Sequence, residues 1–272
     1  MGLRVNTNVM SLNAQRELFN VTDRLSGNYR RLSSGLRIST GADDAAGLGI
    51  SERMRAQIRS YEQAGRNAQD GVSLTQTAEG SLQEVSNNLN RMRELAVQAA
   101  NGTLTTTDRA TIDAEFQELV TEIDRVAGDA SFNGLNLLDG SVATIDLQVG
   151  TDAGDTITVT MVDSTAATLG IDALDVTTAA NASTALAAID TAIDGVSTGR
   201  GTLGAAQNRL NSAIASIANT RENLSAAESR IRDVDVAAET ADLTRNTILQ
   251  QAAVSVLAQA NVQPQLALNL LG

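Results

Sequence analysis

The 272-residue chain is long enough for one large domain or two small ones, and its composition excludes several functions. It contains no Cys and no His, which removes disulfides, thiolate metal sites and the usual general base near neutral pH. The formal net charge of −12 argues against a nucleic-acid partner. Aromatic residues make up 2% and Pro264 is the only proline, a composition that suits long helices packed through small side chains. We expect a mainly α protein with no catalytic site, cofactor or metal.

The first expected element is a helix over residues 5–36. Its apolar residues recur at steps of three and four, which is the spacing of a coiled-coil seam. The seam residues are Leu18, Val21, Leu25, Tyr29, Leu32 and Leu36. Ser33, Ser34 and Gly35 then break the pattern. The chain start lacks the apolar run of a secretory signal, so export would need another route.

A second, much longer helix is expected from Asp43 and Asp44, which can cap its start, to about residue 100. Its second half has a regular seam of Leu82, Val85, Leu89, Met92, Ala96 and Ala99. Asn101-Gly102 ends it. A shorter helix should follow from about Thr107, with Ile112, Phe116, Leu119, Ile123 and Val126 on one face.

Residues 129–199 differ from the rest of the chain in composition, because they contain ten Asp and no Arg. Apolar and polar residues alternate over two stretches that flank a Gly-containing loop, and this pattern predicts a β-hairpin at about 140–165. The inward residues would be Ile145, Leu147, Val149, Ile157, Val159 and Met161. Residues 163–182 are rich in Thr, Ala and Asp, and we expect a loop there.

The strongest periodicity follows, with seven apolar residues spaced by seven: Ile189, Val196, Leu203, Leu210, Ile217, Leu224 and Ile231. Such a seam predicts a long helix packed along other long helices. The companion positions are partly polar: Leu186, Ile193, Arg200, Gln207, Ile214, Arg221 and Glu228. We expect the pairing of this helix with the long second helix to form the folding core. We expect residues 233–239 to connect this helix to the terminal helix.

Residues 246–272 contain no charged side chain. A helix here is apolar around most of its circumference, so it must be buried in a core, a membrane or an assembly. The apolar run is about 13 residues and is interrupted by glutamines, whereas a membrane span needs about 20. We favour an assembly surface over a core helix inside one chain, with residues 5–36 as the partner helix of the same chain.

Several motifs resemble bacterial flagellin in collinear order over residues 1–165 and 200–272. They include Arg31-Leu-Ser-Ser-Gly-Leu-Arg-Ile, Asp43-Asp-Ala-Ala-Gly, Arg66-Asn-Ala-Gln-Asp-Gly, Phe132-Asn-Gly, Ile248-Leu-Gln-Gln-Ala and Val256-Leu-Ala-Gln-Ala-Asn. The resemblance implies a long antiparallel helical coiled-coil bundle with a small β-hairpin region, in a short form with little or no variable outer domain. Residues 1–42 with 236–272 would form a terminal coiled-coil domain, and residues 43–235 a long-helix bundle.

The same resemblance implies a structural subunit that polymerises into the flagellar filament outside the cell. Its implied partners are copies of itself, the flagellar type III export apparatus, a flagellin chaperone, and hook-associated and cap proteins. Neither nucleic acid nor insertion into a membrane is implied. The polymerisation residues would include Leu18, Leu25, Leu32, Leu249, Val256 and Leu257. Arg91, Leu95, Gln98 and Glu115 match positions that animal Toll-like receptors detect in flagellins.

Two other functions stay open at this point. A hook-filament junction protein would have similar termini. A cytosolic coiled-coil adaptor is disfavoured, because such coils usually carry Glu/Lys-rich flanks, whereas this chain has 19% charged residues and no Lys.

Overall fold

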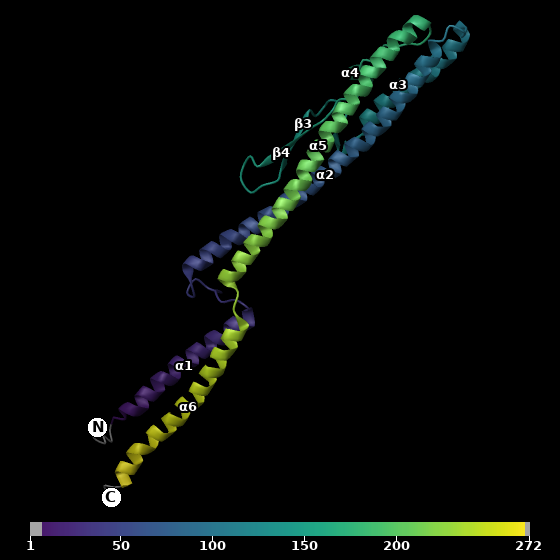
Figure 1. Cartoon of the computed structure of the whole chain (residues 1–272). Helices are drawn as coiled ribbons and strands as arrows, with labels where there is room; N and C mark the ends of the chain where they lie inside the picture. The colour runs from purple at the N-terminus through teal and green to yellow at the C-terminus, as the bar shows by residue number, and fades with distance from the viewer. Residues whose placement is uncertain (1–6, 270–272) are drawn as a thin grey trace. The chain divides into compact units, whose positions relative to one another are not determined.

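The computed structural model describes residues 7–269, and the side chains of residues 7–262 (Figure 1). The helices are α1 (Val9–Ser34), α2 (Ala45–Ala99), α3 (Thr106–Asp129), α4 (Ala166–Leu169), α5 (Ala179–Arg232) and α6 (Val236–Asn269). The strands are β1 (Ser131–Phe132), β2 (Leu135–Asn136), β3 (Thr144–Gln148) and β4 (Thr156–Thr160). The predicted fold class, mainly α with a small hairpin region, is confirmed.

The chain forms two compact units. The terminal unit consists of Met1–Ala56 and Asn223–Gly272, and the middle unit is Gln57–Glu222. Both boundaries fall inside long helices, α2 and α5. The sequence instead suggested boundaries at the helix breaks near residues 42 and 236, and that division into domains stays a prediction.

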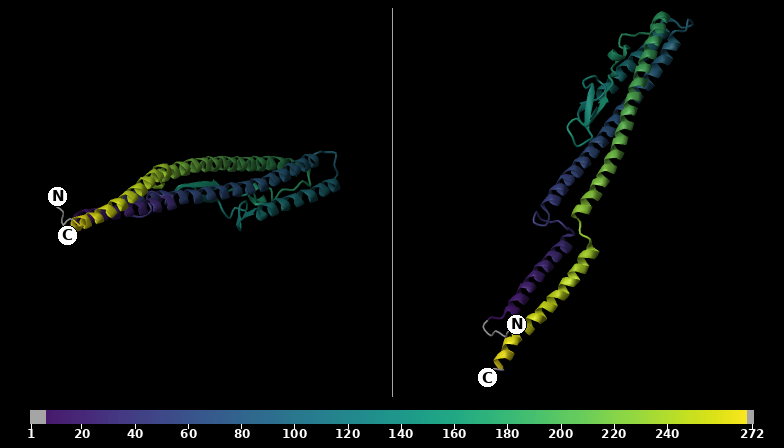
Figure 2. Two further views of the ribbon diagram at one scale, coloured as in Figure 1. Left: turned by 90° about the horizontal axis from the view of Figure 1, so that it is seen from below. Right: turned by 60° about the vertical axis from the view of Figure 1, so that its left-hand side comes forward.

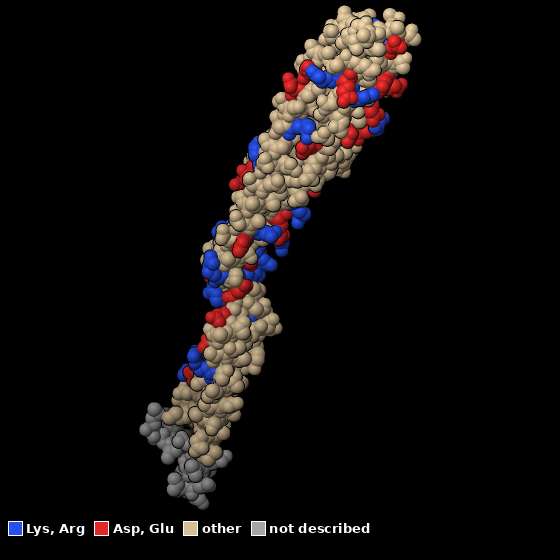
Figure 3. Space-filling view, turned by 45° about the vertical axis from the view of Figure 1, so that its right-hand side comes forward, with Lys and Arg blue, Asp and Glu red and all other residues tan. Residues whose placement is uncertain are grey.

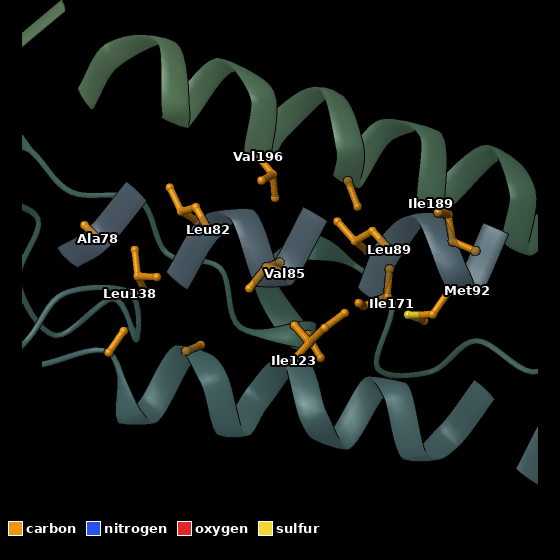
Figure 4. Close-up of a cluster of buried hydrophobic side chains, with 14 of the residues drawn as sticks. Ala78, Leu82, Val85, Leu89, Met92, Ile123, Leu138, Ile171, Ile189 and Val196 are labelled. Carbon is orange, nitrogen blue, oxygen red and sulfur yellow. The ribbon is translucent and has the colours of Figure 1, made fainter. Parts of the chain in front are cut away.

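The core of the middle unit is a row of fully buried side chains on α2. Leu82, Val85, Leu89, Met92, Ala96 and Ala99 are all buried, as the seam predicted. Figure 4 shows α2 between two other helices, with Ile189 and Val196 of α5 on one side and Ile123 of α3 on the other. The heptad spacing of α2 therefore provides one stripe for each neighbour.

Helix α5 buries five of the seven residues predicted at intervals of seven, from Ile189 to Ile217, and Leu224 and Ile231 are half-buried. The predicted companion row is wrong by one position. The buried companions are Ala185, Ala192, Gly199 and Ala206, whereas Leu186, Ile193, Arg200, Gln207 and Ile214 lie at the half-buried edge. Small residues let the neighbouring backbone approach. At Gly199 an added Cβ would lie 2.7 Å from Cγ2 of Val162. Gly199 therefore serves packing, and the other glycines of this helix have open space beside them and do not interrupt it.

The set of buried residues on α3 also differs slightly from the prediction. Ile112, Phe116 and Ile123 are buried as expected, but Val120 and Ala127 complete the row. Leu119 and Val126 are half-buried beside it. Thr105 begins the helix with a capping box, because its hydroxyl accepts from the amide of Asp108 while the Asp108 carboxylate accepts from Thr105.

Residues 163–182 are more ordered than the predicted loop. They contain α4 and the start of α5, and Ser164, Ala166, Ile171 and Val176 are buried. Carboxylates of α3 hold this segment, since Asp124 accepts from the amide of Ala166 (2.7 Å) and Asp113 from the amide of Val176 (2.8 Å). Part of the acidic composition therefore serves to bind backbone N–H groups.

The predicted β-hairpin is present in the expected register, with Ile145 opposite Val159 and Leu147 opposite Ile157. Leu147 packs so closely on α2 that a Cβ added at Gly71 would lie 2.2 Å from its Cδ1. A second, shorter hairpin, β1–β2, was not predicted. Its two-residue turn uses Asn133 and Gly134 at positive φ, 51° and 80°, as Asn-Gly turns favour.

The two aspartates before α2 have different roles. Asp44 caps the helix, because its Oδ1 accepts from the amide of Gly47 at 2.9 Å. Asp43 closes the preceding turn by accepting from the amide and hydroxyl of both Thr40 and Ser39. These hydrogen bonds to Thr40 and Ser39 lower the pKa of Asp43 to about 2.

Truncating a buried leucine of α5 tests this packing. Leu210 is fully buried and lies near Gly71 of α2. Leu210→Ala should lower the free energy of unfolding of the monomer by about 2–5 kcal/mol, measured by urea denaturation. The control is Val97→Ala on α2, because Val97 is half-exposed and its truncation should have a much smaller effect. Equal effects of the two changes would contradict the α2–α5 pairing.

Candidate functional site

Helices α1 and α6 run antiparallel and side by side (Figures 1 and 2). The face of α1 toward α6 follows steps of three and four: Ser11, Ala14, Leu18, Val21, Leu25, Asn28 and Leu32, each buried or half-buried. One predicted seam residue was wrong. Tyr29 is 56% exposed, and Asn28, one position earlier, takes its place in the seam. Hydrophobicity alone selected the tyrosine, whereas the heptad step selects the asparagine.

Asn28 belongs to a buried polar cluster between the two helices. Its Nδ2 donates to Oε1 of Glu239 at 2.5 Å, and its Oδ1 accepts from Nδ2 of Asn246 at 2.8 Å. Asn28 is 5% exposed and Glu239 8%. Arg31 lies 3.6 Å from the same Glu239 oxygen. Because any other alignment of the helices would leave these groups unpaired, the cluster fixes the register of α1 against α6.

A second polar contact lies toward the other end of the pair. Asn8 caps α1 through its Oδ1, which accepts from the amide of Ser11 at 3.0 Å. Its Nδ2 donates to the carbonyl of Ala260 at 2.8 Å. Helix α6 continues through Pro264, which has no N–H to donate to that carbonyl four residues earlier. Asn8 thus supplies the hydrogen bond that the proline cannot make.

The remaining faces of the pair expose large apolar side chains. They are Val9, Met10, Leu12, Phe19 and Tyr29 on α1, and Val236, Ile248, Leu249, Val254, Val256 and Val262 on α6. Phe19 is 75% exposed and Val256 59%. Figure 3 shows that much of this part of the surface carries no charged side chain. Exposed apolar surface of this kind marks a site that other protein covers.

The predicted polymerisation residues divide into two groups. Leu18, Leu25, Leu32 and Leu257 are half-buried, whereas Leu249 and Val256 are exposed on α6. The sequence reading missed Met10, Leu12 and Phe19, which are apolar residues off the seam of α1. These three residues could have been found from the sequence, because they are apolar and lie on the face of α1 that is outside the seam. Side chains beyond residue 262 lie outside the described part of the chain.

The turn after α1 is joined to the three-residue link between α5 and α6. The amide of Arg37 donates to the carbonyl of Arg232 at 2.7 Å, and the amide of Val234 donates to the carbonyl of Gly35 at 3.0 Å. Arg232 also pairs with Glu52 of α2 at 2.7 Å. This junction holds the bases of α1 and α6 together.

The four candidate receptor-recognition residues lie in the middle unit and differ in exposure. Nη2 of Arg91 lies 2.7 Å from Oε1 of Glu115, so the structure brings α2 and α3 together there. The hydrogen bonds to Glu115 and then Glu94 raise the pKa of Arg91. Gln98 is exposed two helical turns beyond Arg91, but Leu95 is only 2% exposed and packs inward.

The described part of the chain offers little for small-molecule chemistry. Residues 7–262 contain no group of three or more carboxylates placed to hold a metal ion. A hollow of about 420 Å³ is open to solvent and is lined by Tyr61, Gly150, Asp155, Ser216 and Thr220 among others. None of the described helices is long and apolar enough to cross a membrane. The exposed apolar faces of the α1–α6 pair are instead typical of a structural protein that contacts other protein chains.

Comparison with known proteins identifies the family. Residues 5–143 match the bacterial flagellin N-terminal helical region, and residues 186–271 match the bacterial flagellin C-terminal helical region. A flagellin of Halalkalibacterium halodurans is 51% identical over 98% of this chain and 99% of its own length. The Bacillus subtilis flagellin is 45% identical over 99% and 100%, and a flagellar filament 30.7 kDa core protein of Treponema maltophilum is 43% identical over 98% and 99%.

Solved structures agree with this assignment. The crystal structure of Bacillus cereus flagellin matches with a TM-score of 0.52 and 37% identity, over 60% of this chain and 94% of that one. A putative flagellar hook-associated protein of Vibrio parahaemolyticus shares the fold, with a TM-score of 0.60 but 17% identity, over 70% of this chain and 100% of that one. The chain belongs to the bacterial flagellin family. It is a structural subunit of the flagellar filament, as the sequence predicted.

The double role of Asn8 can be separated by one substitution. Asn8→Asp keeps an oxygen that caps α1 but replaces the donor to the Ala260 carbonyl with a second acceptor. We expect faster amide hydrogen exchange around residues 258–262, with α1 protection unchanged at its first turn. Asn8→Ser is a second variant that keeps the cap and loses the Nδ2 donor without placing a carboxylate beside the carbonyl, so exchange at the same residues should also become faster. Unchanged exchange in Asn8→Asp would contradict the pairing of Asn8 with Ala260.

Proposed function

We propose that copies of this chain assemble into the filament through the exposed apolar faces of the α1–α6 pair. The observation that supports this is the surface of α6, which is uncharged from residue 246 onward and exposes Ile248, Leu249, Val254 and Val256. Helix α1 covers only one stripe of it. Further copies would cover the rest, and each Å² of apolar surface removed from water contributes about 25 cal/mol.

The contacts between copies would be heterologous. A filament grows without limit when one surface of each subunit binds a different surface of the next, because such contacts do not close a ring. The apolar faces of α1 and α6 supply two such surfaces on opposite helices of the pair. Small shifts between packed helices would then give the filament its discrete lattice states.

A charge placed in the apolar face should prevent assembly without unfolding the monomer. Val256→Glu adds a carboxylate at an exposed position, so the monomer should melt at nearly the same temperature. Burying that carboxylate between copies is costly, so the critical concentration for polymerisation should rise at least about tenfold. Sedimentation and electron microscopy measure the polymer. Ala187→Glu on the exposed side of α5 is the control. Normal filaments from Val256→Glu would contradict the proposed surface.

We infer further that the chain acts outside the cell, after passage through the flagellar export apparatus with the help of a flagellin chaperone. Hook-associated and cap proteins would meet it at the two ends of the filament. No catalytic activity, cofactor or metal is proposed. A hook-filament junction role remains the alternative, because the likeness to a hook-associated protein shows that both share the fold. The identity of 51% to a flagellin favours the filament subunit. Long filaments formed by the purified chain alone would decide for it.

We also propose that the surface around Arg91, Leu95, Gln98 and Glu115 is detected by an animal Toll-like receptor. Arg91, Gln98 and Glu115 are exposed in the described conformation, and Arg91 and Glu115 form one ion-paired surface. Leu95 would contribute by packing beneath them, since it is buried.

Two arginines two residues apart provide a matched test of receptor detection. Arg91 pairs with Glu115 of α3, whereas Arg93 pairs with Asp190 of α5 at 2.7 Å. Arg91→Ala removes two exposed ion pairs, with Glu94 and Glu115, and Arg93→Ala removes one. Exposed ion pairs contribute little, so both effects on stability should be small. In a receptor reporter assay with monomer, only Arg91→Ala should weaken signalling, by about tenfold or more. Equal signalling from both variants would contradict the proposed receptor surface.

A further inference from the structure

Charge is distributed unevenly along the middle unit. Residues 71–206 hold five arginines and nineteen carboxylates, a net charge of −14. Residues 57–70 and 207–222 together hold four arginines and three carboxylates, a net charge of +1. These two segments lie at the same end of the unit, because α2 and α5 run antiparallel, with Gly71 near Leu210 and Glu79 3.7 Å from Arg200. We call this the arginine end, and residues 71–206 the acidic body.

Arginines in the two regions also differ in what they bind. Within the acidic body, Arg91, Arg93, Arg125 and Arg200 form ion pairs, and Arg109 donates to the carbonyls of Ala99 and Asn101. At the arginine end, Arg59, Arg66, Arg209 and Arg221 are exposed and form no ion pair with the described residues. The cations of the acidic body are therefore already engaged. At the arginine end, Arg66 donates to the side chain of Gln63, but none of the four arginines has a carboxylate partner among the described residues, so their charges are available to another molecule.

The acidic body has available carboxylates as well. Many of its aspartates accept hydrogen bonds from backbone amides or from Thr, Asn and Arg side chains, but Glu118, Asp172 and Asp194 are exposed and form no ion pair with the described residues. The side chain of Gln117 donates a hydrogen bond to the carbonyl of Leu174 at 2.9 Å. Glu118 is next to Gln117 in the chain and Asp172 lies two residues before Leu174, so both carboxylates are near this contact. One chain thus carries both halves of a complementary charge pair on separate surfaces.

We propose that the arginine end of one copy contacts the acidic body of the next copy in the filament, with Arg59 and Arg221 facing the carboxylates around Glu118 and Asp172. The partner is a second copy of this chain, so the inference rests on the filament function. Packing two acidic bodies together would oppose like charges, which is costly, whereas the head-to-tail arrangement pairs opposite charges. Such a contact joins two different surfaces and therefore extends without closing. It fixes the axial position of neighbouring copies, which apolar faces alone leave undefined.

A charge exchange between two variants tests the contact. One variant is Arg59→Glu with Arg221→Glu, and the other is Glu118→Arg with Asp172→Arg. Each is polymerised alone from fragments of wild-type filament at about 0.1 M salt, where exposed charges act over about 10 Å. Each alone should have a critical concentration at least about tenfold above wild type, because like charges meet at every contact. An equimolar mixture should assemble to within about threefold of wild type, since alternating copies restore both complementary contacts.

The controls separate this contact from other effects of charge. Arg93→Glu with Arg125→Glu changes the net charge by the same amount as the first variant but leaves the arginine end intact, so it should assemble like wild type. Circular dichroism melts verify that every variant is folded, and a misfolded variant could not be rescued by mixing. Normal assembly of both single variants, or a mixture as poor as its components, would overturn the proposal. Failure of the wild-type chain to form filaments in the same assay would overturn the filament function with it.

Discussion

Helix α6 has more apolar surface than one partner helix can cover, and the rest of the terminal unit depends on this constraint. From residue 246 onward it has no charged side chain to keep any face in water. Helix α1 buries one stripe through Leu18, Val21 and Leu25, and it adds exposed apolar residues of its own, such as Phe19. The pair therefore leaves a surface whose free energy falls only when other protein covers it. In the proposed assembly, the driving force is an excess of hydrophobic surface rather than a specific binding pocket.

The middle unit has the opposite balance, because its hydrophobic surface is satisfied within the chain. α2 is buried on two sides, with Leu82 and Leu89 fully inaccessible, and the small residues of α5 let the chain around Val162 pack against Gly199. Such a core does not need a partner to be stable. Its surface can therefore carry many charges. The nineteen carboxylates of residues 71–206 are tolerated there because the hydrophobic core beneath them is fully buried. The middle unit thus buries its hydrophobic surface within one chain, whereas the terminal unit leaves apolar surface exposed.

Heptad spacing predicted the long helices well, since a seven-residue repeat specifies which face is buried over many turns. Hydrophobicity of the single residue predicted the wrong position where it disagrees with this spacing. Tyr29 was chosen for its hydrophobicity, but the seam position belongs to Asn28, whose polar groups are satisfied by Glu239 and Asn246. The companion row of α5 was misplaced because Ala and Gly give a weak hydrophobic signal although they pack most closely. Pairings such as Arg91 with Glu115 depend on how separate helices meet, and spacing within one helix cannot specify that.

Hydrogen bonds, which are directional, lie between α1 and α6, whereas the outward faces of the pair carry apolar side chains, whose contacts are not directional. This difference bears on how a filament can change shape. The register of α1 on α6 is fixed by Asn8 with Ala260, by Asn28 with Glu239, and by Gly35 with Val234. A shift of one helical turn would break all three contacts and leave buried polar groups unpaired, which is costly. The outward faces carry apolar side chains, which attract without a required angle or partner atom. In the proposed assembly, sliding between copies would therefore cost less than sliding within one copy. Changes of lattice state should then occur between rigid helix pairs, and the proposed charged contacts of the middle unit would limit how far the copies move.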